Sequence, residues 1–267
     1  MAWQPTTIKR PDKLFATATE TVRVTTDAGP GFLKALGNRG GPQYLAADWF
    51  ATQLAAWLGL PTFEFAIIQV TAEDEIRFKN GQAQPGPAFI TREQSQVEWG
   101  GTEDELKALI NPEDIGKLEL FDTWTRNCDR HPPDLTKRKV NRNNVFLSNE
   151  GMAEGKLRLV AMDHTHCFNC GRDLNAQLSH INLVKGDEMF GLFPEFKPFI
   201  RVHWDALTAA VAKLQTLDKQ WVKDLTGAIP VEWQVDSAGR TALATQVCDR
   251  ADYVNETFIA LLQAKLV

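Results

Sequence analysis

The first ninety residues carry short apolar-rich runs, several of which alternate apolar and polar positions in the manner of half-buried strands. The predicted strands are VRVTT (22–26), FLKAL (32–36), FEFAIIQV (63–70) and PAFIT (87–91). Residues 43–58 instead carry apolar side chains at broadly helical spacing, and Gly59 and Pro61 end that helix. The pattern therefore predicts a β-rich layer into which one helix is inserted.

From about residue 103 onward the pattern becomes helical. The predicted helices cover 103–110, 114–127, 203–225 and 241–266, and a hairpin of two short strands covers 145–147 and 157–162. Residues 227–233 predict a turn. This order of elements predicts an α+β protein, with a small β-rich N-lobe over residues 1–90 and a larger, mostly helical C-lobe over residues 91–267.

Composition narrows the classes of function. The chain has 267 residues and a formal net charge of −5, which argues against coating of nucleic acid or binding to anionic membranes. No apolar run approaches the roughly 20 residues of a membrane span, and residues 1–15 lack a secretory signal pattern. The four cysteines are too few for a disulfide scaffold. We therefore expect a cytoplasmic protein with no membrane partner, for which nucleic acid is an unfavoured partner.

Five polar side chains stand within these elements or at their ends, namely Lys34, Asp48, Asp129, Asn144 and Asp163. Lys34 is in a predicted strand, and Asp48 is on the helix that follows it. Asp129 follows a predicted helix, and Asn144 and Asp163 flank the predicted hairpin. Phosphoryl transfer uses such a set: a Lys on the phosphates, an acid that orients it, an Asp at the attacking hydroxyl, and an Asn and an Asp as metal ligands.

Each of these residues also has a purely structural interpretation. Lys34 can be an outward, solvated lysine, Asp48 a surface acid and Asp129 a helix cap. Asn144 can be a turn residue. Asp163 points to function more strongly, because a carboxylate at the end of the apolar run LVAM is costly unless it is used.

Three segments resemble the HipA-like kinase family, in particular its short stand-alone members. They are FDTWTRNCDRH (121–131), NVFL (144–147) and LVAMDHTHCF (159–168). Supporting matches are FLKALGN (32–38), LAADWFATQLAAWLGLP (45–61) and GAIPVEW (227–233), the last followed by a helix that carries Arg250. The resemblance spans nearly the whole chain, and it implies a two-lobed protein-kinase-like fold that binds ATP and Mg²⁺.

The resemblance also implies a role for each polar residue of the set. Lys34 would contact the phosphates, and Asp48 would orient Lys34. Asp129 would be the catalytic base, and Asn144 and Asp163 would ligate the metal.

Further nucleotide contacts follow from the same resemblance. The loop ATATE (16–20) would cover the phosphates in place of a glycine-rich loop, with Thr17 or Thr19 as hydrogen-bond donor. The segment PAFITREQ (87–94) would be the interlobe hinge against adenine, and Trp99 follows it as a candidate border of the site. The predicted hinge contacts are Phe89, Ile90 and Arg92.

The chain departs from the family pattern in two places. The family usually has Glu where Asp48 stands, and Asp is one methylene shorter, so the ion pair requires a helix nearer the strand. Asp129 and Asn144 are fifteen positions apart, whereas kinase catalytic loops have about five, and Asn143 competes with Asn144 as metal ligand. A longer loop closes at little extra cost when both of its ends are anchored, but such an insertion can also mark an inactive kinase.

The inserted residues carry a basic cluster of Lys137, Arg138, Lys139 and Arg142. Such a cluster contacts an acidic substrate, a phosphorylated partner or an RNA backbone, or else it is the solvated surface of a loop. Its place between candidate catalytic residues keeps a substrate-side role open. Lys137–Arg142 is therefore a candidate contact for an acidic or phosphorylated partner.

A zinc site is a competing interpretation of the stretch after Asp163. His164, His166, Cys167 and Cys170 lie within seven residues, and Cys-x-x-Cys with nearby His is typical of zinc ligands. There is one Cys-x-x-Cys, however, and a strand leaving Asp163 cannot easily turn all four side chains to one point. We expect instead that Cys167 packs in the C-lobe, that His164 orients Asp163 and that His166 is exposed.

The predicted activity is transfer of the γ-phosphoryl group of ATP, with Mg²⁺, to a Ser or Thr hydroxyl of a protein. Two alternatives stay open. A small-molecule hydroxyl is the acceptor in aminoglycoside- and choline-type kinases, which share the fold and a similar Asp, Asn and Asp set. A nucleotide-binding pseudokinase that acts as an interaction module fits the Asp48 substitution and the long insertion.

Overall fold

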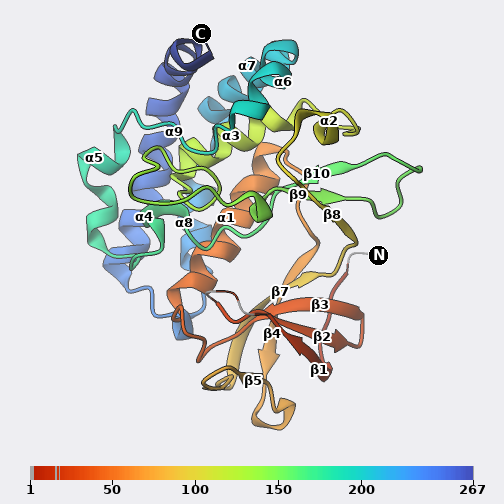
Figure 1. Cartoon of the computed structure of the whole chain (residues 1–267). Coiled ribbons are helices and arrows are strands. Elements are labelled where there is room, and N and C mark those ends of the chain that lie inside the picture. The colour runs from red at the N-terminus through yellow and green to blue at the C-terminus, as the bar shows by residue number, and fades with distance from the viewer. Residues whose placement is uncertain (1–2, 16, 18, 267) are drawn as a thin grey trace.

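The computed structural model describes residues 3–15, 17 and 19–266. Its N-terminal part is an antiparallel sheet in the order β1-β2-β3-β7-β4, drawn at the bottom of Figure 1. The strands are β1 (Ile8–Leu14), β2 (Val22–Thr26), β3 (Gly29–Lys34), β4 (Phe65–Val70) and β7 (Gly86–Arg92). A small hairpin of β5 (Arg77–Phe78) and β6 (Gly81–Gln82) lies between β4 and β7 in the chain.

The predicted strands are confirmed as β2, the end of β3, β4 and β7. The sequence pattern did not predict β1, because Pro11 lacks an amide hydrogen and the positions after Ile8 are all exposed. β1 is an edge strand of the sheet, and its pairing with β2 is irregular on either side of Pro11. An edge strand of this kind tolerates proline.

Helix α1 (Gln43–Leu58) has the bounds that the sequence predicted. It ends at Gly59, whose φ of 92° is in the left-handed region that glycine adopts freely. Side chains around most of α1 are buried, including that of Asp48. The apolar residues of α1 belong to the large core of the C-terminal helices, whereas the sheet has a separate core. α1 therefore joins the two parts of the protein (Figure 1).

The C-terminal part is mostly helical and is drawn in the upper half of Figure 1. Its helices are α2 (Glu103–Leu106), α3 (Asp114–Thr125), α4 (Cys167–Cys170), α5 (Ile181–Val184), α6 (Lys197–Val202), α7 (Trp204–Lys213), α8 (Lys219–Gly227) and α9 (Ser237–Leu266). A sheet in the order β10-β9-β8 comprises β8 (Gln96–Glu98), β9 (Phe146–Ser148) and β10 (Arg158–Val160). No helix in the described part of the chain is both long enough and apolar enough to cross a membrane.

The hairpin and the helices predicted at 114–127 and 241–266 are confirmed as β9 and β10, α3 and α9. Residues 203–225, predicted as one helix, instead form α7 and α8. The break occurs because Leu217 is extended and the Asp218 carboxylate caps α8, accepting hydrogen bonds from the amides of Gln220 and Trp221. The segment 103–110 contains the single turn α2 in place of a longer helix.

Helix α3 buries a carboxyl group that has no hydrogen-bond partner among the described residues. Both oxygens of Glu119 are unpaired, and the side chain is fully buried. Burial raises the pKa of Glu119 well above its ordinary value, and the neighbouring Asp122 adds to the rise. Burial therefore favours the protonated form of the Glu119 carboxyl in the folded protein.

We expect Glu119→Gln to remove a pH-dependent loss of stability. The pKa of Glu119 in the folded protein lies above its unfolded value of 4.5. Above about pH 4.5 the unfolded state therefore binds fewer protons at this residue than the folded state does. Wild-type stability then falls as pH rises, by up to about 1.4 kcal/mol per pH unit. Urea unfolding between about pH 5.5 and 8 should show a shallower fall for the variant. Glu256→Gln, at an exposed position of α9, should keep the wild-type slope, and equal slopes in all three proteins would contradict the prediction.

Candidate active site

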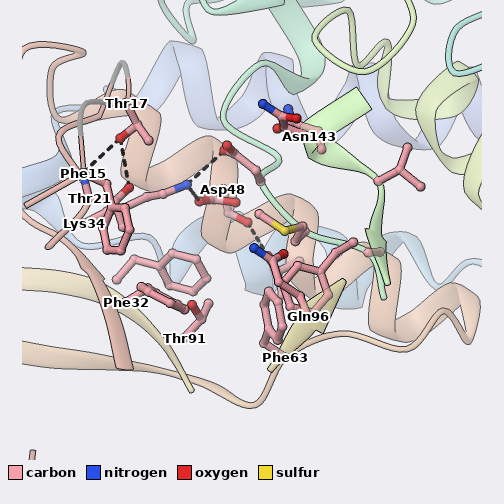
Figure 2. A pocket seen from close by; sticks show the side chains of 18 of the residues that line it. Phe15, Thr17, Thr21, Phe32, Lys34, Asp48, Phe63, Thr91, Gln96 and Asn143 are labelled. Carbon is pink, nitrogen blue, oxygen red and sulfur yellow. Dashed lines mark hydrogen bonds and ion pairs between the residues drawn. The ribbon is translucent and has the colours of Figure 1, made fainter. Parts of the chain in front are cut away.

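A cavity of about 380 Å³ opens between the N-terminal sheet and the β10-β9-β8 sheet. Its size is that of a small-molecule site. Figure 2 looks into it, with Lys34 and Asp48 between the Thr17–Thr21 loop and Asn143. Both parts of the protein contribute to its lining, which includes Phe32, Lys34, Asp48, Phe89, Thr91, Trp99, Asn143, Asn144, Met162 and Asp163.

The register of β3 and β7 decides which side chains face the cavity. Phe32 lies opposite Thr91, and Lys34 lies opposite Phe89. All four residues line the cavity, because opposite residues of an antiparallel pair share one face of the sheet. The predicted contact Phe89 is thus at the cavity, and Thr91, which the sequence did not single out, lies beside it.

Successive side chains of β7 point to opposite faces of the sheet. The predicted contacts Ile90 and Arg92 are corrected on this ground, because their side chains do not line the cavity. Ile90 is fully buried in the core of the N-terminal sheet. Arg92 forms ion pairs with Glu64 (2.9 Å) and Glu150 (2.5 Å). Side chains alternate between the two faces of a strand, so the face of β7 that carries Phe89 excludes Ile90 and Arg92. That alternation is the sequence signal that could have corrected both predictions.

The loop between β1 and β2 contributes Thr17 to the cavity. The Thr17 hydroxyl donates to Thr21 Oγ1 (3.2 Å) and accepts from the Thr21 amide (3.0 Å), so these two cavity residues are held together (Figure 2). Thr19, the other predicted donor, is 3% exposed and does not line the cavity. Residues 16 and 18 of the predicted ATATE loop lie outside the described residues.

Lys34 forms ion pairs with two carboxylates from distant parts of the chain. Its Nζ lies 2.6 Å from Asp48 Oδ2 and 2.9 Å from Asp163 Oδ1 (Figure 2). Burial acts to lower the pKa of Lys34, but the two carboxylates outweigh it and raise the pKa above its ordinary value. Burial acts to raise the pKa of Asp163, yet the Lys34 ammonium brings it to about 2. Lys34 is therefore protonated and Asp163 ionised at neutral pH.

The Asp48 carboxylate connects α1 to both sides of the cavity. Its Oδ2 accepts from Lys34 Nζ, and its Oδ1 accepts from the backbone amide of His164 at 2.8 Å. Burial raises the pKa of Asp48, and Lys34 opposes that rise. The Asp48 side chain, one methylene shorter than the Glu that the resemblance leads one to expect, still forms a 2.6 Å pair with Lys34.

Asp163 and Asn144 both fit a divalent cation. Asp163 has a φ of 52°, a left-handed conformation that is uncommon outside glycine and is found at functional sites. Its Oδ1 accepts from Lys34 and Thr165, whereas its Oδ2 accepts no hydrogen bond from the residues that the structure describes. The Asn144 Oδ1 likewise has no donor in the described part of the chain. Two free oxygens in one cavity match the hard ligands that Mg²⁺ prefers.

Asp129 and Asn144 are fifteen positions apart in the chain but adjacent in three dimensions. Asn144 Nδ2 donates to Asp129 Oδ2 at 2.9 Å. The two ends of the insertion are joined by a hydrogen bond of 3.0 Å from the Asn141 amide to the Arg130 carbonyl. The insertion therefore leaves and returns at one place, as the slow growth of loop-closure cost permits. Asn144 is buried, while Asn143 is exposed and also lines the cavity.

The Arg130 side chain holds together the segments that carry these residues. It is fully buried and forms an ion pair with the fully buried Asp122 of α3. Its Nε donates to the Asn144 carbonyl (2.9 Å), and its Nη2 donates to the Met162 carbonyl (2.9 Å). Because Met162 directly precedes Asp163, one guanidinium fixes both candidate metal ligands relative to α3.

Three of the four cations in the basic cluster face carboxylates of this chain. The pairs are Lys137–Asp134 (3.1 Å), Arg138–Asp129 (3.4 Å) and Arg142–Glu195 (3.3 Å). Lys139 is exposed and has no ion pair among the described residues. The insertion therefore carries less unpaired positive charge than its sequence suggests. The acidic partners of Arg138 and Arg142 lie outside the insertion, so its sequence does not reveal them.

Cys167 and His164 do not form part of a common metal site. Cys167 is buried and donates to Thr125 Oγ1 (3.4 Å), which confirms its predicted packing in the C-lobe. The His164 ring is buried against Phe121, with the ring centroids 4.9 Å apart. His164 was expected to orient Asp163, but its ring nitrogens have no hydrogen-bond partner in the described part of the chain. The backbone amide of His164, and not its ring, contacts the candidate site by donating to Asp48 Oδ1.

His166 and Cys170 face the loop of residues 127–144, which carries Asp129. His166 was predicted to be exposed, but it is partly buried, because its segment folds back toward Asp129 and places the His166 Nδ1 3.5 Å from the carboxylate. Its ring packs edge-on against Tyr44, and the Cys170 thiol lies 3.9 Å from the carbonyl oxygen of Arg126. The described residues contain no group of three or more His, Cys, Asp or Glu side chains that could hold a metal ion.

Strand β8 and the residue after it complete the cavity. Gln96, Glu98 and Trp99 all line it. Trp99, the candidate border residue, packs against Phe193 (5.0 Å) and Phe196 (5.4 Å). Gln96 and Glu98 were not predicted from the sequence, because a three-residue exposed strand carries no apolar alternation.

A β-rich lobe, a helical lobe and a cavity between them that holds an ion-paired strand lysine together define a two-lobed, protein-kinase-like architecture. A family model described as HipA-like kinase matches residues 32–257. The chain therefore belongs to the HipA-like kinase family, which makes it a kinase-type phosphotransferase by class. A comparison with curated proteins gives no significant match.

Solved kinase structures are similar to this chain. The proinflammatory kinase CtkA of Helicobacter pylori matches with a TM-score of 0.60 and 12% identity, over 98% of this chain and 100% of that one. The Golgi casein kinase matches with a TM-score of 0.46 and 10% identity, over 99% and 76%. Its structure with Mn/ADP bound matches with a TM-score of 0.47 and 10% identity, over 97% and 75%. The likeness to CtkA bears on the fold alone, and the predicted α+β kinase-like fold is confirmed.

Proposed function

We propose that this protein transfers the γ-phosphoryl group of ATP, with Mg²⁺, to a Ser or Thr hydroxyl of a protein. The observation that carries the proposal is the meeting of Lys34, Asp163 and Asn144 around one cavity, with Asp129 hydrogen-bonded to Asn144. These residues come from a strand, the segment after β10 and the two ends of the insertion. They supply the charged and polar groups that phosphoryl transfer needs, and family membership supports the same class of chemistry.

Each side chain has a part that follows from its surroundings. The protonated Lys34 neutralises phosphate charge, and Asp48 holds the ammonium in place at 2.6 Å. Asp129 accepts the proton of the acceptor hydroxyl as its oxygen attacks. The amide of Asn144 fixes Asp129 Oδ2, and Arg138 approaches Oδ1 at 3.4 Å, so the carboxylate of the base is oriented.

Asp163 and Asn144 are the residues that would hold the metal. A bound Mg²⁺ neutralises charge on the transferring phosphoryl oxygens. One carboxylate and one amide are sufficient as protein ligands, since Mg²⁺ keeps several waters and also binds phosphate oxygens. The low pKa of Asp163, about 2, keeps this carboxylate ionised and ready to bind a cation at neutral pH.

Stabilisation by Mg²⁺ and ATP tests the proposed site. A ligand that binds the folded state alone adds about 2.7 kcal/mol at about 100 times its dissociation constant, so the midpoint of thermal unfolding should rise. Asp163→Asn should lose most of this rise, because it removes the negative charge that faces the cation. Asp173→Asn, an exposed position in the same segment, should keep it. A wild-type protein that ATP does not stabilise, with or without Mg²⁺, would exclude the nucleotide site.

The insertion supports a second part of the proposal, that Lys139 and Arg138 attract an acidic or phosphorylated segment of the substrate or partner. Lys139 is exposed, and Arg138 lies beside the proposed base. We expect Lys139→Gln to raise KM for an acidic peptide several-fold at low salt and less at high salt, because exposed charges are screened. Lys9→Gln makes the same charge change on edge strand β1. Equal KM values for both variants would rule out this contact.

The contact between Arg138 and Asp129 favours one alternative, a nucleotide-binding pseudokinase whose candidate base is held by the insertion. Stabilisation by Mg²⁺ and ATP without transfer to any acceptor would support that alternative. Transfer to low-mass hydroxyl compounds, with none to proteins, would instead support a small-molecule kinase. Radiolabel transfer to the protein itself, to a proteome extract and to its low-mass fraction separates the three.

A further inference from the structure

Cys128 and Cys170 form a pair of thiols that the proposed function does not use. Cys128 directly precedes Asp129 on the loop of residues 127–144, and Cys170 ends α4 in the segment that follows Asp163. Both are free thiols; each shifts the pKa of the other, and the Cys170 Sγ lies 3.9 Å from the carbonyl oxygen of Arg126, two residues before Cys128. Two segments that the proposed chemistry depends on therefore lie side by side where these thiols stand.

The two thiols differ in pKa and in exposure. Such a difference suits a pair in which one cysteine reacts with an oxidant and the other then forms the disulfide with it. The hydrogen bond from Cys128 lowers the pKa of Cys170; burial opposes this, and Arg126, Arg138 and Arg172 lower the pKa further. Cys170 is partly exposed, whereas Cys128 is 4% exposed and has a pKa raised by the same contact and by burial. Thiolates react with peroxides in preference to thiols, so Cys170 is the sulfur that reacts first.

Arg138 couples this pair to the proposed base. One of its nitrogens donates to the Cys170 carbonyl and another to Asp129 Oδ1, both at 3.4 Å. The Cys170 thiol also contacts the Arg126 carbonyl at 3.9 Å. A change in the position of either sulfur is therefore transmitted to Asp129, through the chain from Cys128 and through Arg138 from Cys170.

We propose that Cys128 and Cys170 are an oxidative modification site, which forms a reversible disulfide on reaction with a peroxide and thereby displaces the proposed base Asp129. The Cys170 thiolate attacks one peroxide oxygen, the O–O bond breaks, and the departing oxygen takes up a proton. The Cys128 thiol then displaces the hydroxyl of the resulting Cys170 sulfenic acid as water. Two thiols lose two electrons, the peroxide gains them, and an added dithiol reverses the change.

The expected loss of transfer rests on the proposed function and follows from geometry. Two sulfurs in a disulfide lie about 2.05 Å apart, much closer than two thiols in hydrogen-bonding contact, so the backbone at Cys128 must shift. Asp129 is the next residue, and a displacement on the order of 1 Å at a catalytic group can cost about 100-fold in rate. We therefore expect oxidation to lower transfer about 100-fold and a dithiol to restore it.

Peptide mapping after treatment of the full chain with hydrogen peroxide tests the pair without reference to kinase activity. We expect a cross-linked Cys128–Cys170 peptide that dithiothreitol separates. Cys128→Ser should leave a sulfenic acid on Cys170 that dimedone traps, and Cys170→Ser should give neither product. Cys248→Ser, a buried thiol on α9, should leave formation of the bond unchanged.

Three results would overturn the proposal. Free Cys128 and Cys170 thiols after full oxidation of a small thiol in the same solution would exclude the pair. A Cys167–Cys170 disulfide would assign the reaction to the Cys-x-x-Cys motif, which the structure disfavours because Cys167 is buried and bound to Thr125. A Cys128–Cys170 bond with unchanged transfer would remove the inhibitory effect. If the reduced protein shows no transfer at all, the proposed function fails, while the mapping still decides whether the thiols pair.

Discussion

Asp129→Asn should lower phosphoryl transfer by about 10²- to 10⁴-fold, the usual effect of losing a general base. Asparagine keeps the shape of the side chain and can still accept the hydrogen bond from Asn144, but it cannot take up the proton of the acceptor hydroxyl. Asp129 is not among the residues that line the cavity, so stabilisation by Mg²⁺ and ATP should persist. Radiolabel transfer and thermal unfolding measure the two effects separately.

The exposed acid Asp173 provides the control, since Asp173→Asn removes the same charge away from the Asp129–Asn144 pair. That variant should transfer phosphate at the wild-type rate. Wild-type transfer by Asp129→Asn would refute the assignment of the base. Loss of nucleotide stabilisation in the same variant would instead indicate that Asp129 acts by arranging Asn144 for the metal.

Arg130→Met should lower the free energy of unfolding by about 3–5 kcal/mol, because it leaves a buried carboxylate without its partner. Asp122 is fully buried, and its Oδ2 already has no hydrogen-bond partner among the described residues. The substitution also removes the donors to the carbonyls of Asn144 and Met162. Urea denaturation measures the change, and the variant should also bind Mg²⁺ and ATP more weakly because both candidate metal ligands lose their anchor.

A double variant separates the charge from the packing. Arg130→Met with Asp122→Leu should recover part of the loss, because no unpaired buried charge remains. Lys107→Met removes the exposed pair with Asp104 (2.6 Å) and should cost less than about 1 kcal/mol. A cost for Arg130→Met as small as that for Lys107→Met would show that the buried pair does not hold the site together.

Local sequence signals were sufficient for most of the elements that carry the candidate site. Helix α1 was predicted with its bounds because apolar spacing and Gly59 act within one segment. The hairpin β9–β10 was predicted because two short apolar strands flank a polar connection. Prediction failed at β1 and β8, where an exposed or proline-containing strand depends on pairing with a partner that its own sequence does not reveal.

The sequence by itself determined the order of chemical groups, from Lys34 and Asp48 through Asp129 to Asn144 and Asp163, and with that order the resemblance to the family. Residue types and their succession along the chain are properties of the sequence alone. They specify which class of chemistry is available, and the family match over residues 32–257 agrees with that class.

Only the tertiary structure decided which of these groups meet and which neighbours share their surroundings. The register of β3 against β7 turned Phe89 and Thr91 toward the cavity and Ile90 away from it. In the folded chain the two ends of the insertion meet, and its Arg138 lies beside Asp129. Cys170 lies beside the loop that carries Asp129. The physical reason is that a strand face, an ion pair or a thiol contact depends on a partner distant in sequence, and packing selects that partner.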